Sequence, residues 1–190
     1  MQALSERAKQ LIPKAQIVSF ESWQDMSNEA IARFHTANEE KRYLTNEDLD
    51  AVGAHHASTL QRLRDQAPAI VDEARAEVLQ AHPGILEPGG GLYPAIRAEA
   101  CWRDFWQFLR CITYGIASAH QQYTSAEGLA AMEQLYEELK VPLPAMVTGL
   151  KGIKKASLSR VPAEQHELMT PYFDHLITHM AHFLDATPVS

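Results

Sequence analysis

The chain has 190 residues, of which 46% are apolar, enough for one well-filled core and one domain. Its 17 basic and 24 acidic residues give a formal charge of −7, which argues against a nucleic-acid groove or an anionic membrane surface. Two cysteines cannot form a disulfide framework, and neither a signal-peptide core nor a run of about 20 apolar residues is present. We expect a soluble, cytoplasmic protein whose partner is a protein or a small molecule.

The first two expected helices, at about residues 4–11 and 22–37, are peripheral, and a third helix is expected at about residues 45–65. Ser22 has a side chain suited to the N-cap of the second helix. Thr45 is the expected N-cap of the third helix, with Asp48 as its capping-box partner. Oxygens at these positions satisfy backbone N–H groups that the first turn of a helix leaves unpaired.

Five further segments carry apolar residues at helical spacing, at about residues 70–81, 101–116, 129–139, 147–158 and 168–184. Residues 83–91 contain two prolines and four glycines, which predict a tight corner before the central helix. No segment alternates apolar and polar residues as a strand does. The chain is therefore predicted to be all-α, with seven to nine helices.

The central helix carries a cluster of side chains that could hold one ligand. Cys101 and Asp104 are three residues apart, so the thiol and the carboxylate project from nearly the same face of the helix. Trp102 and Arg103 lie between them in the sequence. A ligand on that face could therefore contact both a sulfur and a carboxylate.

Several motifs resemble those of the phycobiliproteins, the bilin-carrying globins of light-harvesting antennae. That family has a Pro-Gly-Gly turn, then Cys-x-Arg-Asp, then Leu-Arg-x-x-Thr-Tyr. It also has an upstream Arg-Tyr-Leu-x-x-x-(Asp/Glu)-Leu motif and a pattern in the last helix that looks like Tyr-Phe-Asp. The matching stretches here are residues 88–90, 101–104, 109–114, 42–49 and 172–174. The resemblance covers about residues 38–183 and makes the chain similar to allophycocyanin and phycocyanin subunits.

This resemblance implies a globin-like fold with extra N-terminal helices, in a single domain of residues 1–190. Residues 1–37 would form an N-terminal extension, and residues 38–184 the globin core. The resemblance further implies a bilin as cofactor, a linear tetrapyrrole similar to phycocyanobilin, and a bilin lyase as a partner. A role in light harvesting or pigment handling follows, and not catalysis.

The resemblance also implies which residues contact the pigment. Cys101 would form a thioether to ring A, Asp104 would accept hydrogen bonds from the pyrrole nitrogens, and Arg103 would pair with the propionates. The aromatic side chains that could pack against the tetrapyrrole are Tyr93, Trp102, Phe105 and Tyr114.

The residues alone leave other interpretations open. A free cysteine such as Cys101 is commonly a small buried hydrophobe, and aromatic residues at helical spacing are commonly core. A non-covalent bilin carrier and an unpigmented interaction module are therefore alternatives to a covalent pigment protein. A haem-binding globin is a further alternative, although no histidine lies in the central helix between residues 94 and 119. His175, His179 and His182 share a helix face, but they suggest a polar surface in preference to a metal site.

Several positions depart from the family pattern and suggest a divergent or stand-alone member, such as a globin associated with bilin biosynthesis. Asn38 replaces an aspartate that, in antenna subunits, pairs across the subunit interface with the arginine matching Arg110. Gly91 replaces an asparagine of the turn, and residues 117–119 replace Ala-Gly-Asp.

The loss of that aspartate bears on assembly. An arginine left without its acid in a subunit interface disfavours the usual heterodimer. The apolar faces around Leu44, Leu49 and the first N-terminal helices would still need cover, and exposed faces of that kind self-associate. We expect a homodimer in which Arg110 finds a different acid or stays solvated.

Overall fold

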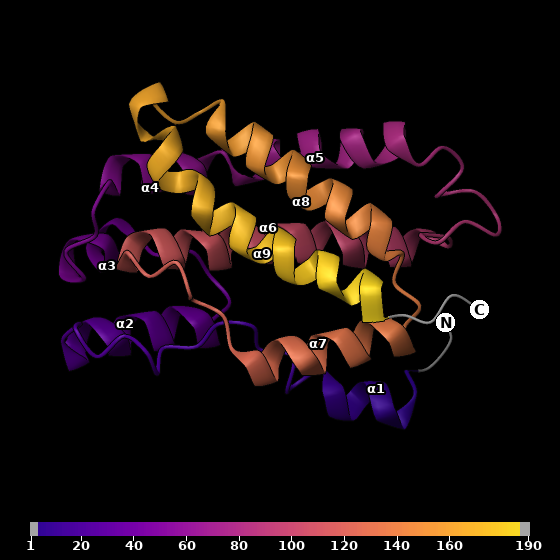
Figure 1. The fold of residues 1–190 in the computed structure, drawn as a ribbon, viewed down its shortest axis with the longest axis horizontal. Helices are drawn as coiled ribbons and strands as arrows, with labels where there is room; N and C mark the ends of the chain where they lie inside the picture. Colours follow the sequence, from indigo (N-terminus) through magenta and orange to yellow (C-terminus); the bar gives the residue numbers. More distant parts are fainter. Residues whose placement is uncertain (1–3, 187–190) are drawn as a thin grey trace.

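The computed structural model describes residues 4–186, and all of its regular elements are helices (Figure 1). They are α1 (Glu6–Leu11), α2 (Asn28–Glu39), α3 (Asn46–Ala51), α4 (Ala57–Asp65), α5 (Ala67–Ala81), α6 (Ala95–Ser118), α7 (Ala126–Glu138), α8 (Leu143–Leu158) and α9 (His166–Ala186), with a 3-10 turn at Ala163–Gln165. The predicted all-α fold is confirmed, with nine α-helices in the described residues. Within the same residues, no helix is both long and apolar enough to cross a membrane.

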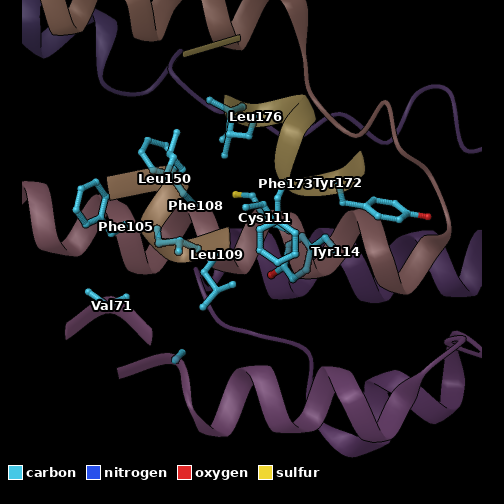
Figure 2. Packing of buried hydrophobic residues seen from close by; sticks show 14 of the residues in the cluster. Val71, Phe105, Phe108, Leu109, Cys111, Tyr114, Leu150, Tyr172, Phe173 and Leu176 are labelled. Atoms are coloured by element: carbon cyan, nitrogen blue, oxygen red, sulfur yellow. The ribbon is translucent and has the colours of Figure 1, made fainter. Parts of the chain in front are cut away.

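Helix α6 lies at the centre of the fold and contacts α4, α5, α8 and α9 (Figure 1). Its apolar stripe faces the core as its spacing predicts. In Figure 2, Phe108 of α6, Leu150 of α8 and Leu176 of α9 belong to one buried cluster. Helix α8 approaches α6 closely because Gly149 has no side chain. A Cβ at that position would lie 1.9 Å from the ring of Phe105.

The start of the second helix differs from the prediction. Ser27, and not Ser22, is the N-cap of α2, and its hydroxyl accepts a hydrogen bond from the backbone N–H of Ala30. The preceding residues turn around the fully buried Trp23, whose ring packs 4.9 Å from that of Phe34, centroid to centroid. Because the segment that buries this indole is not helical, α2 begins after it. The presence of a favourable N-cap residue at Ser22 was therefore not enough to locate the start of the helix.

The third predicted helix begins where expected but is broken. The capping box at Thr45 and Asp48 is confirmed, since each side chain accepts a hydrogen bond from the other's backbone N–H. The prediction of a continuous helix to residue 65 is wrong, because α3 ends at Ala51 and α4 begins at Ala57. Gly53, just after α3, has a φ of 63° in the left-handed region that ends a helix, and His56, the N-cap of α4, has a φ of 60°.

The N-terminal extension is attached to the connection between α6 and α7. The N–H of Ser19 donates to the carbonyl of Tyr123 at 3.0 Å, and that of Ser125 donates to the carbonyl of Ile17 at 2.8 Å. Gly128 lets the two segments approach, since a Cβ there would lie 1.9 Å from the carbonyl oxygen of Gln16. Helix α1 packs on α7 in a second, smaller apolar cluster.

One apolar core spans both parts of the predicted domain, from Ile17 to Phe183. The boundary between an extension of residues 1–37 and a core of residues 38–184 is therefore not a boundary in the packing. Residues 1–3 and 187–190 of the predicted domain lie outside the described residues.

Trp23→Ala should lower the free energy of unfolding by about 3–5 kcal/mol, because it empties a fully enclosed site where the segment before α2 packs on α2. Urea denaturation followed by circular dichroism measures the change. Ile12→Ala is the control: Ile12 is 42% exposed, and its loss should change the stability by about 0.5 kcal/mol or less. Equal, small effects would mean that the extension adds nothing to the fold.

Candidate functional site

Cys101 lies in the second turn of α6, under helix α8. Its thiol is 5% exposed, and Sγ is 3.1 Å from Sδ of Met146. Burial, and then the nearby charge of Asp104, raise the pKa of the Cys101 thiol to about 12. At neutral pH the sulfur is therefore protonated, and its reactivity as a nucleophile is low.

Asp104 lies one turn after Cys101 and is partly buried. Its Oδ2 accepts a hydrogen bond of 2.8 Å from the hydroxyl of Tyr136 on α7. Burial raises the pKa of the Asp104 carboxyl, although the Tyr136 hydrogen bond and the charge of Arg103 act to lower it. Within the described residues, this one phenol is the only side-chain donor to a carboxylate that can accept several hydrogen bonds.

Three of the predicted ligand-binding residues lie towards solvent. Arg103 is exposed, and among the described residues it has neither a side-chain hydrogen bond nor an ion pair. Trp102 is partly buried, with the guanidinium carbon of Arg75 5.4 Å from its ring centroid. Tyr93 precedes α6 and is 47% exposed. A ligand that contacts Asp104 from the solvent side could therefore also reach Arg103, but it would have to extend around α6 to reach Trp102, which projects about 200° away from Asp104 on the helix.

The other two aromatic candidates belong to the core. Phe105 is fully buried against Gly149 of α8. Tyr114 is 13 residues beyond Cys101, about 20 Å along the helix axis, and Figure 2 shows it well separated from Phe105. Its hydroxyl donates to the backbone carbonyl of Arg42 and accepts from the side chain of Arg110. The structure does not bring Tyr114 to the Cys101–Asp104 face.

Residues 32–180 match the family described as "Phycobilisome protein". The chain belongs to the phycobilisome protein family. The resemblance predicted from its motifs is confirmed, as is the globin-like, all-α fold that it implies. This is a bilin-binding, light-harvesting family.

Individual members of the phycobilisome protein family are similar over most of the chain. Allophycocyanin subunit alpha-B from Synechocystis sp. (strain ATCC 27184 / PCC 6803 / Kazusa) is 31% identical over 151 residues, which cover 76% of this chain and 94% of the relative. The allophycocyanin alpha-B chain from Cyanidium caldarium is 33% identical over 152 residues, which cover 76% of this chain and 93% of the relative. The N-terminal 31 residues lie outside the family match.

Two residues of this phycobilisome protein complete the site without having been predicted. Met146 and Tyr136 come from α8 and α7, where the sequence shows them only as members of apolar helix faces. Tyr136 carries the only available signal, a hydroxyl in an otherwise apolar stripe that needs a polar partner when buried. Its partner could not be identified before the packing of α7 on α6 was known.

Cys111, the second cysteine, lies ten residues after Cys101 on a different side of α6. It is buried in the core cluster, where burial raises the pKa of its thiol. In Figure 2 it lies beside Phe173 of α9. The two thiols therefore have separate surroundings, and only Cys101 accompanies Asp104.

The histidines of α9 do not converge on a common point. Nε2 of His175 is 2.7 Å from the hydroxyl of Thr124, and its ring packs edge-on against His179. Burial, and then the charge of His179, lower the pKa of His175 to about 4. No group of three metal-ligating side chains occurs in residues 4–186.

Arg110 is satisfied within one chain, contrary to the expectation that it pairs with a new acid or stays solvated. It is only 4% exposed, and it donates to the side-chain oxygens of Asn38 (3.0 Å), Gln107 (2.7 Å) and Tyr114 (2.8 Å). These acceptors are neutral, and two of them come from its own helix.

The apolar faces expected at the surface are covered too. Leu44 and Leu49 are both buried in the core cluster of the single chain. Together with the pairing of Arg110, this burial removes two of the reasons for a homodimer, whereas Leu4 and Ile12 beside the first N-terminal helix remain 45% and 42% exposed.

We expect the stability of the protein to fall as the pH rises through the titration of Asp104. Its folded pKa is raised above the ordinary 3.8, so between these two values the folded state holds more protons than the unfolded state. Asp104→Asn should remove this dependence and equal or exceed the wild type in stability at neutral pH. Urea denaturation from about pH 4 to 8 measures it. Parallel curves for the two proteins would contradict the prediction.

Met146→Ala should increase the reactivity of Cys101, because it removes the side chain that covers the sulfur. Each unit by which the thiol pKa falls raises the thiolate fraction about tenfold. Iodoacetamide labelling of a Cys111→Ala background, read by mass spectrometry, measures the rate. Met169→Ala is the matched control, since Met169 is also fully buried but lies on α9. If both variants increased the labelling rate of Cys101 equally, the cause would be a general loosening of the core. That result would refute a specific protection of Cys101 by Met146.

Proposed function

We propose that this phycobilisome protein is a pigment protein that holds a bilin on the N-terminal half of α6, attached by a thioether at Cys101. The observation that carries the proposal is the arrangement of Asp104. Its carboxylate is partly buried, has a raised pKa and one phenolic donor, and lies one turn from a thiol. A desolvated acceptor with unused hydrogen-bonding capacity is suited to pyrrole N–H groups.

The neighbouring side chains fit the same group. Arg103 is exposed and forms no side-chain hydrogen bond or ion pair among the described residues, so its guanidinium can bind a propionate in a bidentate manner. Trp102 offers a partly exposed ring to a planar ligand. When bound, a linear tetrapyrrole supplies visible absorption, and Asp104 would favour its protonated form. Phe105 would pack against the pigment from the core side, whereas Tyr114 lies too far along α6 to contact it.

The surroundings of Cys101 suggest that attachment needs assistance. Thioether formation adds the sulfur and its proton across a carbon–carbon double bond of ring A, so no group leaves. The thiol is covered by Met146 and has a pKa of about 12, and both features oppose this addition. We infer that a bilin lyase, or a displacement of α8 at Met146, opens the site.

The burial of Cys101 also favours a second candidate function, a non-covalent bilin carrier. In that case Asp104, Arg103 and Trp102 bind the pigment reversibly, and the thiol remains a small core residue. The two functions differ in whether colour survives denaturation. A homodimer remains a prediction of the sequence, and light scattering at micromolar concentration measures it.

The test is co-expression with a bilin pathway and a lyase, followed by a denaturing gel and zinc-enhanced fluorescence. Covalent colour should be present in the wild type and in Cys111→Ala, and absent in Cys101→Ala. Asp104→Asn should weaken and broaden the long-wavelength band, because a neutral amide does not favour the protonated tetrapyrrole.

The alternatives give different patterns in the same experiment. Pigment that stays with the native protein but is lost on the gel supports the carrier. Colour that depends on Cys111 would place the pigment elsewhere. A colourless protein with every bilin supplied would reject both pigment functions.

A further inference from the structure

Arg97 is a charged residue in the first turn of α6 that the pigment site does not use directly. It lies four residues before Cys101. Its Nε donates to the carbonyl of Gly91 at 3.0 Å, and its Nη2 donates to the carbonyls of Leu139 and Lys140 at 3.0 and 2.7 Å. One guanidinium therefore joins the glycine corner to the end of α7.

The same two segments also touch directly. A Cβ on Gly91 would lie 2.9 Å from Cβ of Pro142, so a side chain at position 91 would displace the proline ring. Between α7 and α8 the chain passes through Lys140, whose φ of 51° lies in the left-handed region. The absence of a side chain at Gly91, where antenna proteins have asparagine, thus has a physical reason here.

The α7–α8 connection leads to both partners of the proposed pigment site. Tyr136, which donates to Asp104, is three residues before Leu139. Met146, which covers Cys101, is four residues after Pro142. The position of this connection therefore sets where both side chains meet α6.

We propose that Arg97 is a positioning residue, which clamps the α7–α8 connection to the glycine corner and so holds Tyr136 on Asp104 and Met146 on Cys101. Its bearing on pigment rests on the proposed function, whereas the clamp itself can be measured without pigment. The planar guanidinium has five donors in a fixed fork, and it reaches three carbonyls of two segments at once. A lysine ammonium could satisfy only part of this set.

The first measurement uses the full chain without bilin. The titration of the Asp104 carboxyl is followed by carbon-13 NMR, with Tyr136, Arg103 and Cys101 as the groups that face it. Tyr136→Phe removes a hydrogen bond that lowers the pKa of Asp104, so the titration midpoint should rise. Arg97→Gln should raise the midpoint in the same direction. In the double variant, Arg97→Gln should add nothing to Tyr136→Phe, because it acts through that residue.

Arg160→Gln is the matched control, since Arg160 also donates to a backbone carbonyl, that of Ala156, but at the far end of α8. It should leave the Asp104 midpoint unchanged. Gly91→Ala tests the other half of the clamp with a smaller change and should shift the midpoint as Arg97→Gln does. An Asp104 midpoint that stays constant or falls in both clamp variants, whatever happens to the melting temperature, overturns the proposal.

The second measurement uses pigmented protein. If the wild type carries a bilin, Arg97→Gln should broaden the long-wavelength band as Tyr136→Phe does. Arg97→Lys should give a band between those of the wild type and Arg97→Gln, and Arg160→Gln should match the wild type. An unaltered band in Arg97→Gln would overturn the pigment part of the proposal. If the wild type takes up no bilin, the proposed function fails, and the titration of the pigment-free protein still decides on the clamp.

Discussion

The close approach of α8 to α6 is the contact on which the rest of the structure depends. It is possible because Gly149 presents only backbone to the ring of Phe105. With the helices this close, Met146 reaches the sulfur of Cys101, and the thiol is excluded from water. Burial in this packing is therefore the main cause of the raised pKa of the Cys101 thiol, and the charge of Asp104 is the second.

Much of the fold was predictable from local signals, because helix periodicity and capping depend on residues near one another in sequence. The box at Thr45 is an example. The start of α2 was not predictable, because it depends on burial of Trp23 against Phe34. The break after α3 was missed because a single glycine, Gly53, looks compatible with a continuous helix.

The candidate site was likewise predictable only where it depends on residues near one another in sequence. The shared face of Cys101 and Asp104 follows from helix geometry, so the sequence predicted it. Tyr136 and Met146 reach that face from other helices, and their contacts exist only after α7 and α8 have packed. Tyr114 was expected near the pigment because it belongs to a family motif that follows Cys101 closely in the sequence. Along the helix axis, however, it lies well away from Cys101.

The covered thiol of Cys101 also affects how the protein withstands oxidants. The thiolate, and not the thiol, attacks a peroxide, and the oxidation series from sulfenic to sulfonic acid starts with that first step. A sulfur held in the protonated form beneath Met146 is a poor substrate for this chemistry. In the proposed pigment protein, the cover that opposes attachment would thus also protect the sulfur of Cys101 from oxidants before the pigment is bound.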